Sequence, residues 1–597
     1  MKHQYYKIMN IPLDEQIDPR CLILMTNKKD SITIKRNTLV PLTKEKIKIS
    51  FSTYFGAFHI EPWKNFTNIK DIIFSFTLKG KGILRIKYIN SFGEEAVILE
   101  KEFSYSEPSN EIVSINLENL QNIGIIYPEF IFTENSDWLL RDLAYLTSKK
   151  PEQDITLALI MTTFKKENFV YTNINNLKRV LSDKINLIII DNGQSIKLTE
   201  SSPYIKIYYN PNYGGTGGFT RGLLEVLKNG KYSHIVLMDD DIVVYPETIL
   251  RTLKFFEYAQ SPIVIGGAML NLSQKEIINE CGALYKNLSI TLLKHNLNIC
   301  NSKHLLKYTD PEYIGYFGWW FFGLPVKVIQ KVQLPFPFFI RGDDIEYSYR
   351  LRKIYPHINF VSLLGVGVWH EEFYKKDNPV IDYYINRNGL IFSILYEREK
   401  FNKSIKKVLL SIIKNLLLYK YERVKYILLG IEDFLKGPNF LKSINPEEYH
   451  NYLQSIQSVK PQNFKEIFLS YKYKRKIRFP KLKKLLSFIT LNGHILPNIL
   501  IQEGKKPEDD GFIFEPLHSN RVEAIFLKET VIFYEPTKGI GLKYKHSKKL
   551  FFKYLFKAII LIIKLFFNQK SLHTKYEKEF KYLTSPDFWK KYLKLDT

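Results

Sequence analysis

Alternating apolar and polar positions dominate the first part of the chain. Apolar residues alternate with polar ones from 74 to 78 and again from 84 to 88, and a Lys-Gly-Lys-Gly segment at 79–82 separates the two runs. A period of two is typical of strands that bury one face, and lysine and glycine between two such runs indicate a turn. We therefore expect residues 1–147 to form an N-terminal β-sandwich, which acts either as a scaffold or as a carbohydrate-binding module.

From residue 155 onward, short apolar runs alternate with segments of helical period. The pattern predicts strands at 155–161, 186–190, 204–209 and 234–238, and helices at 168–181 and from the glycine-rich turn to Lys228. Strands that alternate with helices favour a parallel sheet with right-handed crossovers. We assign residues 148–398 to an α/β domain with a Rossmann-like, mostly parallel sheet.

The remainder of the chain, residues 399–597, is predicted to be mainly helical and is rich in lysine. Segment 549–567 interleaves phenylalanine, leucine and isoleucine with lysines. It fits an amphipathic helix in a membrane interface, with an ordinary core-facing helix as the alternative. No stretch reaches the roughly 18 uncharged apolar residues that a spanning helix requires.

Charge and cysteine content narrow the possible partners. The 86 basic and 61 acidic residues give a net charge of +25, which implies anionic partners such as a nucleotide, a nucleic acid or an anionic membrane surface. We expect no nucleic-acid partner, because the lysines lie mostly after residue 400, outside any nucleic-acid-binding motif.

The cysteines and the N-terminus bear on the compartment. Three cysteines without metal-type spacing argue for a reducing compartment and against a disulfide. No apolar segment of the signal-peptide type follows the N-terminus. We therefore expect a cytoplasmic protein on the inner face of the cell membrane.

Three consecutive acids, Asp239, Asp240 and Asp241, follow the apolar strand 234–238. Adjacent carboxylates repel one another, so a folded site needs a cation or a hydrogen-bond cage to hold them. Ligands of open α/β sheets bind outside the carboxyl ends of the strands. The acids are therefore placed for a metal-bound phosphate ligand. Alternatively, they form an acidic loop in which Asp241 caps the helix expected at 246–258.

Segment 210–222, between a strand and a helix, contains four glycines in five positions. Glycines allow backbone N–H groups to approach a ligand closely, and a helix N-terminus favours anions. The segment matches neither the dinucleotide fingerprint nor the P-loop. It predicts contact with a nucleotide or a sugar, with a simple turn as the alternative.

Later residues add further candidate chemistry. Trp319 and Trp320 are suited to stacking on sugar faces, although core packing is an alternative. Asp343 and Asp344 stand at a predicted helix start, where one acid can cap the helix and the other can serve as a general base. His370 ends a Gly/Val strand and is either structural or a metal ligand. A carboxylate–imidazole set suits Mn²⁺ at least as well as Mg²⁺.

In combination, these motifs resemble the GT-A, family 2 glycosyltransferases, and more narrowly the bacterial galactofuranosyltransferases that extend galactan chains from UDP-galactofuranose. The likeness covers roughly residues 50–400. Its motifs are Asn212-x-Gly-Gly-x-Gly-Gly-Phe-Thr-Arg-Gly, Met-Asp-Asp-Asp at 238–241, Gly-Trp-Trp-Phe-Phe at 318–322, Asp343-Asp344, Trp369-His370, and an N-terminal segment at 53–63 that is similar to the family's β-sandwich.

The resemblance implies a role for each matching residue. It implies Asp239, Asp241 and His370 as ligands of Mn²⁺ or Mg²⁺. It implies Asp344 as the base that deprotonates the acceptor hydroxyl, with Asp343 orienting the acceptor. Residues that line the sugar and acceptor site would be Trp319, Trp320 and Glu280. Donor-binding residues would be Thr163, Lys165, Asp191, Asn192, Asn212, Gly214, Gly215, Gly217, Gly218, Arg221 and Asp240.

Two departures from the family leave the donor sugar open. Lys165 and Lys166 stand where the family often has Asn-Arg, and lysine does not replace a planar guanidinium. Asn192 stands where the family often has glutamine.

The expected function is inverting transfer of galactofuranose from UDP-galactofuranose to a hydroxyl of a lipid-linked saccharide, in cell-surface polysaccharide synthesis. One alternative is a transferase that uses another UDP- or dTDP-sugar. Another is a non-enzymatic, basic protein that binds membranes or nucleic acid. The sequence leaves the oligomeric state open and allows a homo-oligomer.

Overall fold

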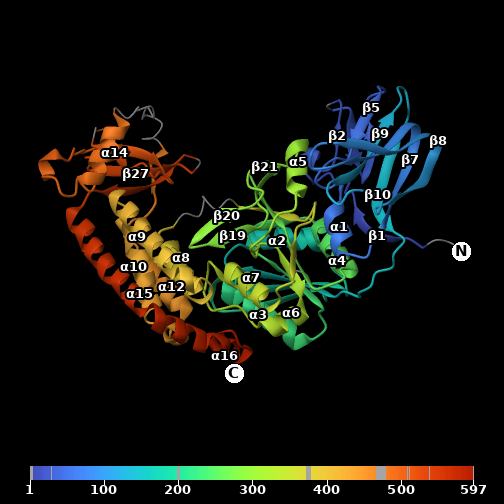
Figure 1. Ribbon diagram of the computed structural model, residues 1–597. Coiled ribbons are helices and arrows are strands. Elements are labelled where there is room, and N and C mark those ends of the chain that lie inside the picture. The colour runs from blue at the N-terminus through green and yellow to red at the C-terminus, as the bar shows by residue number, and fades with distance from the viewer. Residues whose placement is uncertain are drawn as a thin grey trace.

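The computed structural model describes residues 4–28, 30–197, 202–371, 378–465, 479–506, 509, 511–536 and 538–595. Figure 1 shows three consecutive regions: a β-rich N-terminal region, a central α/β region, and a C-terminal region in which long helices carry a small sheet. The central region lies between the other two.

The N-terminal region is an antiparallel sheet with the strand order β2-β5-β9-β7-β10-β4-β3, to which β1, β6 and β8 are added. These elements are β1 (Tyr6–Asn10), β2 (Met25–Thr26), β3 (Ile32–Lys35), β4 (Thr38–Pro41), β5 (Ile47–Ser50), β6 (Phe58–His59), α1 (Ile60–Phe66), β7 (Asp71–Ile89), β8 (Glu95–Asn116), β9 (Ile125–Phe132) and β10 (Leu139–Thr147). The expectation of a β-rich N-terminal region is confirmed.

The turn expected at residues 79–82 is wrong, because β7 continues through it. The register of β7 against β8 shifts between Leu78 and Gly80, so the strand bends without reversing direction. Gly80 has φ +116°, and a Cβ on Gly82 would lie 2.1 Å from the carbonyl oxygen of Ile131. The glycines therefore allow a bulge and a close strand approach where the pattern indicated a hairpin.

The central sheet has the order β13-β12-β11-β14-β22-β16-β23. Its strands are β11 (Leu157–Thr163), β12 (Ile185–Asp191), β13 (Ile205–Tyr209), β14 (His234–Met238), β16 (Ile263–Gly266), β22 (Phe322–Pro325) and β23 (Asn359–Val361). β13, β12, β11 and β14 run parallel, and β22 is antiparallel to both of its neighbours. Every residue of β11, β12 and β14 is buried, as expected for strands covered on both faces. The expected mostly parallel α/β core is confirmed.

Helices lie around this sheet (Figure 1), and the central region contains a second, separate sheet. The helices are α2 (Glu167–Leu177), α3 (Gly214–Asn229), α4 (Pro246–Tyr258), α5 (Ser302–Thr309), α6 (Val326–Val332) and α7 (Asp343–Ile354). The second sheet has the order β15-β24-β17-β18-β21, formed by β15 (Ile242–Val244), β17 (Ala268–Asn271), β18 (Ile277–Glu280), β21 (Leu297–Asn298) and β24 (Gly367–His370). β19 (Ala283–Lys286) and β20 (Ser289–Leu292) form a separate hairpin.

The C-terminal region contains α8 (Ile381–Tyr396), α9 (Phe401–Leu417), α10 (Tyr421–Leu435), α11 (Pro438–Ser443), α12 (Pro446–Ser455), α14 (Pro480–Ile489), α15 (Lys548–Leu583) and α16 (Pro586–Tyr592). It also contains a four-stranded sheet of β25 (Gln462–Asn463), β28 (Ile540–Lys545), β27 (Thr530–Glu535) and β26 (Phe512–Pro516). A mainly helical region is confirmed, but the sheet was not expected. The sequence also contains a basic stretch at 472–484, of which residues 472–478 lie outside the described residues.

Helix α15 is the longest helix of the described chain, at 36 residues. It packs on α8, α9 and α10 through one buried seam: Phe551, Ala558, Leu561, Leu565, Leu572, Tyr576 and Leu583. Among the described residues, no helix combines the length and apolarity needed to cross a membrane.

A disulfide joins Cys21 of the N-terminal region to Cys300 of the central region. The expectation of no disulfide is therefore wrong. The two cysteines are 279 positions apart in sequence, and only the docking of the two regions brings their Cα atoms within 5.4 Å. Cys281 is free and buried.

Candidate functional site

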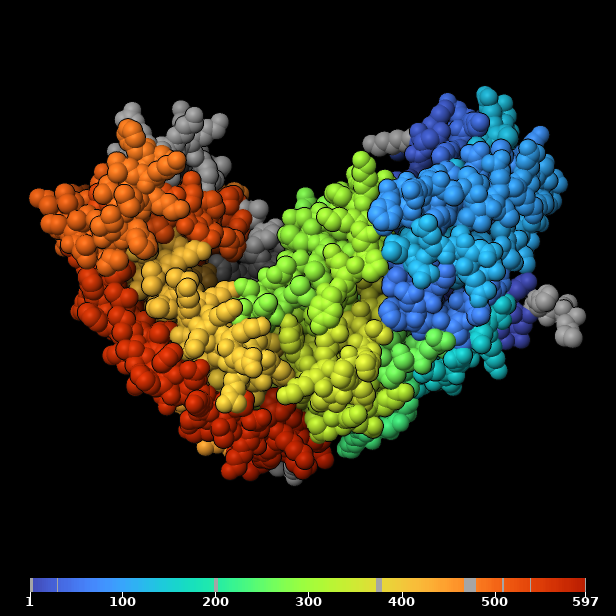
Figure 2. Space-filling model, viewed as in Figure 1, coloured from blue at the N-terminus to red at the C-terminus, as the bar shows by residue number. Residues whose placement is uncertain are grey.

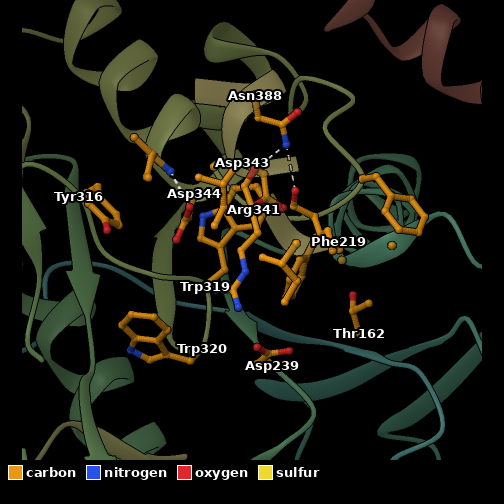
Figure 3. A pocket seen from close by; sticks show the side chains of 18 of the residues that line it. Thr162, Phe219, Asp239, Tyr316, Trp319, Trp320, Arg341, Asp343, Asp344 and Asn388 are labelled. Atoms are coloured by element: carbon orange, nitrogen blue, oxygen red, sulfur yellow. Dashed lines mark hydrogen bonds between the residues drawn. The ribbon is translucent and has the colours of Figure 1, made fainter. Parts of the chain in front are cut away.

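A cavity of about 1030 Å³ lies at the carboxyl ends of β11, β12 and β14 (Figure 3). Its walls also come from the start of α3, the β19–β20 hairpin, the loop before α7, and helices α8 and α12. This is the edge of an open α/β sheet at which ligands bind. Residues from the central and C-terminal regions therefore share one pocket.

At one end of the site, Asp239, Asp241 and His370 bring potential ligand atoms within 4.8 Å of one another. His370 Nε2 lies 3.1 Å from Asp241 Oδ1 and 3.8 Å from Asp239 Oδ2. Strand pairing explains this convergence, since β15 follows Asp241 directly and its Ile242 is the register partner of His370 in β24. Asp241 therefore does not cap α4, whose N-cap is Tyr245.

The surroundings of His370 suit a metal ligand. Its Nδ1 lies 2.5 Å from the carbonyl oxygen of Glu371. A proton donated from Nδ1 to that oxygen leaves the lone pair of Nε2 facing the two carboxylates, an arrangement common among metal-binding histidines. Two carboxylates and one imidazole form a donor set that fits Mn²⁺ or Mg²⁺. These three residues form a candidate site for a divalent cation.

Asp343, Asp344 and Glu280 also line the cavity. Asp343 is buried and accepts a hydrogen bond from Thr216 Oγ1 at 2.7 Å. Burial and the neighbouring charge of Asp343 raise the pKa of Asp344 to about 7, although the N–H of Ile345 partly stabilises its anion. Burial, assisted by the charge of Asp344, raises the pKa of Glu280 to about 8. A carboxyl group with such a pKa can accept a proton near neutral pH.

The glycine-rich segment forms the first turn of α3. Gly214 has φ +69°, and its N–H donates to Asn212 Oδ1 at 3.2 Å. Asn192 Nδ2 donates to the carbonyl oxygen of Gly214 at 2.9 Å, which ties this turn to the end of β12. A Cβ on Gly215 would meet only open space. The turn therefore presents an accessible helix N-terminus to the cavity.

Aromatic rings line part of the cavity. The Trp319 ring contacts Phe219, and the Trp320 ring lies edge-on to His370 with centroids 6.3 Å apart. Trp319 Nε1 and Glu280 Oε1 are buried, and neither has a hydrogen-bond partner among the described residues. Buried polar atoms normally have partners. A buried donor and a buried acceptor on the walls of one cavity suit the hydroxyl groups of a polar ligand.

The sequence-derived donor-binding set divides into two groups. Those that line the cavity are Thr163, Asn192, Asn212, Gly214, Gly215 and Asp240. Those that do not are Lys165, Asp191, Gly217, Gly218 and Arg221.

The second group has structural contacts instead. The Asp191 carboxylate accepts N–H bonds from the loop after β12. A Cβ on Gly217 or Gly218 would collide with neighbouring side chains, so both serve close packing of α3. Arg221 pairs with Glu225. Lys165 has φ +56° and packs its ammonium over Phe164.

Several residues that line the cavity were not anticipated from the sequence: Arg341, Asn388, Tyr285 and His450. Arg341 lies near the end of the loop between α6 and α7, and the other three lie on a hairpin or on C-terminal helices. Only Arg341 had a signal in the sequence, because it lies two residues before Asp343.

The α/β fold, with acids and a glycine-rich turn at one sheet edge, is compatible with a glycosyltransferase, and the comparisons agree. The model of "Glycosyl transferase family 2" matches residues 158–283. The protein is a glycosyltransferase with a GT-A catalytic domain.

The narrower resemblance is confirmed as well. The "Galactofuranosyltransferase 2 N-terminal" model matches residues 8–148. The chain is 26% identical over 471 residues to galactofuranosyltransferase GlfT2 of Mycobacterium tuberculosis (strain ATCC 25618 / H37Rv), covering 72% of each protein. It is also 26% identical to GlfT2 of Mycolicibacterium smegmatis (strain ATCC 700084 / mc(2)155), covering 66% of this chain and 65% of that one.

Similarity to solved structures is weaker. GalNAc-T7 with UDP, GalNAc and Mn²⁺ shares 13% identity at a TM-score of 0.31, over 41% of this chain and 48% of that one. At such a score the assignment rests on the sheet topology and the family model.

Proposed function

We propose that this protein transfers galactofuranose from UDP-galactofuranose to a hydroxyl of a saccharide acceptor, with inversion. The GlfT2 relatives and the matching N-terminal model support this sugar. The observation that carries the proposal is that Asp239 and Asp344 line the same cavity. Trp319 and Trp320 line it as well. The proposed phosphate-binding side and the proposed base therefore face the same cavity.

The residues divide the reaction between them. The acceptor hydroxyl gives its proton to Asp344 as its oxygen bonds to the anomeric carbon. The bond from that carbon to the diphosphate breaks, and its electron pair stays with the departing UDP. Asp343, held by Thr216, orients the acceptor, and Trp319 and Trp320 contact the sugars. A flattened, positively charged sugar in the transition state is expected, as in glycoside chemistry generally.

The residues that would hold the cation are Asp239, Asp241 and His370. When bound, Mn²⁺ or Mg²⁺ would neutralise charge on the diphosphate. Asp240 has a different role from these three residues, because its carboxylate accepts a hydrogen bond from the N–H of Phe164 at 2.9 Å. It supports the loop after β11, next to the position of the nucleotide.

A donor panel tests this proposal. Release of UDP or dTDP is measured with UDP-galactofuranose, UDP-galactopyranose and a dTDP-sugar, and mass spectrometry of products on a synthetic lipid-linked acceptor follows. Preferential transfer from UDP-galactofuranose supports the proposal. A preference for another donor at least tenfold stronger would replace galactofuranose but leave a family 2 transferase.

We also propose that the protein acts at an anionic membrane surface, on the cytoplasmic side, where a lipid-linked acceptor would be presented. Helix α15 exposes a second apolar stripe opposite its buried seam: Phe556, Ile559, Ile560, Ile563, Phe566 and Phe567. Lys553 and Lys564 are exposed beside this stripe. The helix forms the outer edge of the C-terminal region (Figure 2). Apolar residues flanked by lysines suit an interfacial position.

Sedimentation with vesicles tests this surface. The full chain should bind vesicles that contain phosphatidylglycerol, and a Phe556→Ser, Ile560→Ser, Phe567→Ser variant should lose that binding. Phe92→Ser, which alters an 85% exposed phenylalanine of the N-terminal region, is the matched control. Unchanged binding of the triple variant would exclude α15, and retention on nucleic acid at physiological salt would favour the non-enzymatic alternative.

A further inference from the structure

The loop that leads into α7 has an unfavourable backbone conformation. Phe339 and Arg341 have φ of +74° and +67°, and Gly342 follows with φ +86°. Residues with a Cβ avoid this left-handed region, and such residues concentrate at functional sites. Something must therefore hold the loop in place.

The loop is held from two sides. From α8, Asn388 Nδ2 donates to the carbonyl oxygens of Ile340 and Arg341 at 2.9 and 2.8 Å, and Arg387 Nη2 donates to that of Phe338 at 2.7 Å. From α3, the N–H of Thr216 donates to the carbonyl oxygen of Phe339 at 3.1 Å. Asn388 and Arg387 are each 2% exposed, so this clamp is part of the interior.

The clamp directs the Arg341 side chain into the cavity. Arg341 is exposed there, and Figure 3 shows its guanidinium extending toward Asp239. The accessible start of α3, with Gly214 and Gly215, lines the same cavity. The positive charge of Arg341, the helix N-terminus and the candidate cation site thus surround one space.

We infer that Arg341 binds the sugar-linked phosphate of the nucleotide donor, and that Asn388 is the positioning residue that holds Arg341 there. The inference rests on the proposed function. A planar guanidinium donates two parallel hydrogen bonds to a phosphate. Negative charge on that phosphate grows as the sugar departs, so the same contact assists both binding and reaction.

Binding of UDP and of uridine to the full chain, measured by calorimetry with metal and again with EDTA, tests the role of Arg341. Arg341→Gln should weaken UDP binding about 10- to 100-fold in both conditions and leave uridine binding unchanged. Arg341→Lys should weaken it less. Arg398→Gln, which alters an exposed arginine outside the cavity, is the control. Equal UDP affinity of wild type and Arg341→Gln would overturn the inference.

A second pair of variants tests Asn388. Asn388→Ala should weaken UDP binding, and adding Arg341→Gln to it should cause no further loss beyond that of Arg341→Gln alone. Asn386→Ala is the matched control, because the amide of Asn386 donates to the carbonyl of Asp382 in its own helix and not to the loop before α7 in the described part of the chain. Additive losses would show that Asn388 does not act through Arg341. If wild type binds UDP but transfers no galactofuranose, the proposed sugar fails while this inference stands.

Discussion

The pKa of Asp344 makes a quantitative prediction about the pH dependence of transfer. Burial and the charge of Asp343 raise this pKa to about 7. Only the ionised carboxylate can accept the proton of the acceptor hydroxyl. The rate should therefore rise with pH and level off above about 7.

The size of the effect follows from the same value. At pH 5.5 about 3% of Asp344 would be ionised, so the rate should be about 30-fold below its plateau. Asp344→Asn removes the base and should lower the plateau by about 10²- to 10⁴-fold. The variant should also lose the rise between pH 5.5 and 8. UDP binding should stay close to wild type, since the proposed partner of Asp344 is the acceptor hydroxyl.

Initial rates at saturating donor and acceptor, measured from pH 5 to 9, check this prediction. Asp183→Asn, at an exposed site away from the cavity, controls for a general effect of losing a carboxylate. A rate for Asp344→Asn within tenfold of wild type would refute the base assignment. So would a wild-type profile that is flat down to pH 5.5.

Three further predictions concern the stability of the fold, the cation site and the disulfide. Because Asp344 has a folded-state pKa above its ordinary 3.8, its ionisation lowers the free energy of unfolding as pH rises from about 4 to about 7. At pH 8, Asp344→Asn should therefore have a higher free energy of unfolding than wild type, by up to about 4 kcal/mol, and a correspondingly higher thermal midpoint. A difference between the two proteins that is the same at pH 4 and pH 8 would contradict this. Asp241→Ala and His370→Ala should each abolish the gain in UDP affinity that Mn²⁺ gives wild type, and calorimetry that shows the full gain would exclude the metal role. Cys300→Ser should lower the thermal midpoint in oxidising buffer, because without the bond between positions 279 residues apart the unfolded chain has more conformational freedom. Dithiothreitol should lower the wild-type midpoint equally. A midpoint insensitive to both the substitution and the reductant would contradict a stabilising disulfide.

Short-range patterns in the sequence were sufficient to predict the strands and helices of the central region. The apolar runs of β11, β12 and β14 are buried on both faces, and the strand-helix order leaves a parallel arrangement as the favourable one. This places residues after these strands, including Asn192 and Asp239, at one sheet edge. Where the local pattern allowed two conformations, as at Gly80 and Gly82, the pairing of β7 with β8 and β9 decided the outcome.

The long-range contacts could not be predicted from the sequence. The Cys21–Cys300 bond, the small C-terminal sheet and the contribution of His450 to the cavity depend on how separate regions dock. Pairings between positions hundreds of residues apart leave no periodic signal in either segment.

The sequence by itself determined the chemistry available to this protein: its acids, its glycine turn, its paired tryptophans and their order along the chain. The tertiary structure decided which of these groups meet. The pairing of β15 with β24 brings His370 to Asp241, and the clamp from α8 turns Arg341 into the cavity. The physical reason is that side-chain types and local periods are properties of neighbouring residues, whereas a site exists only where the packing of distant segments makes their functional groups converge.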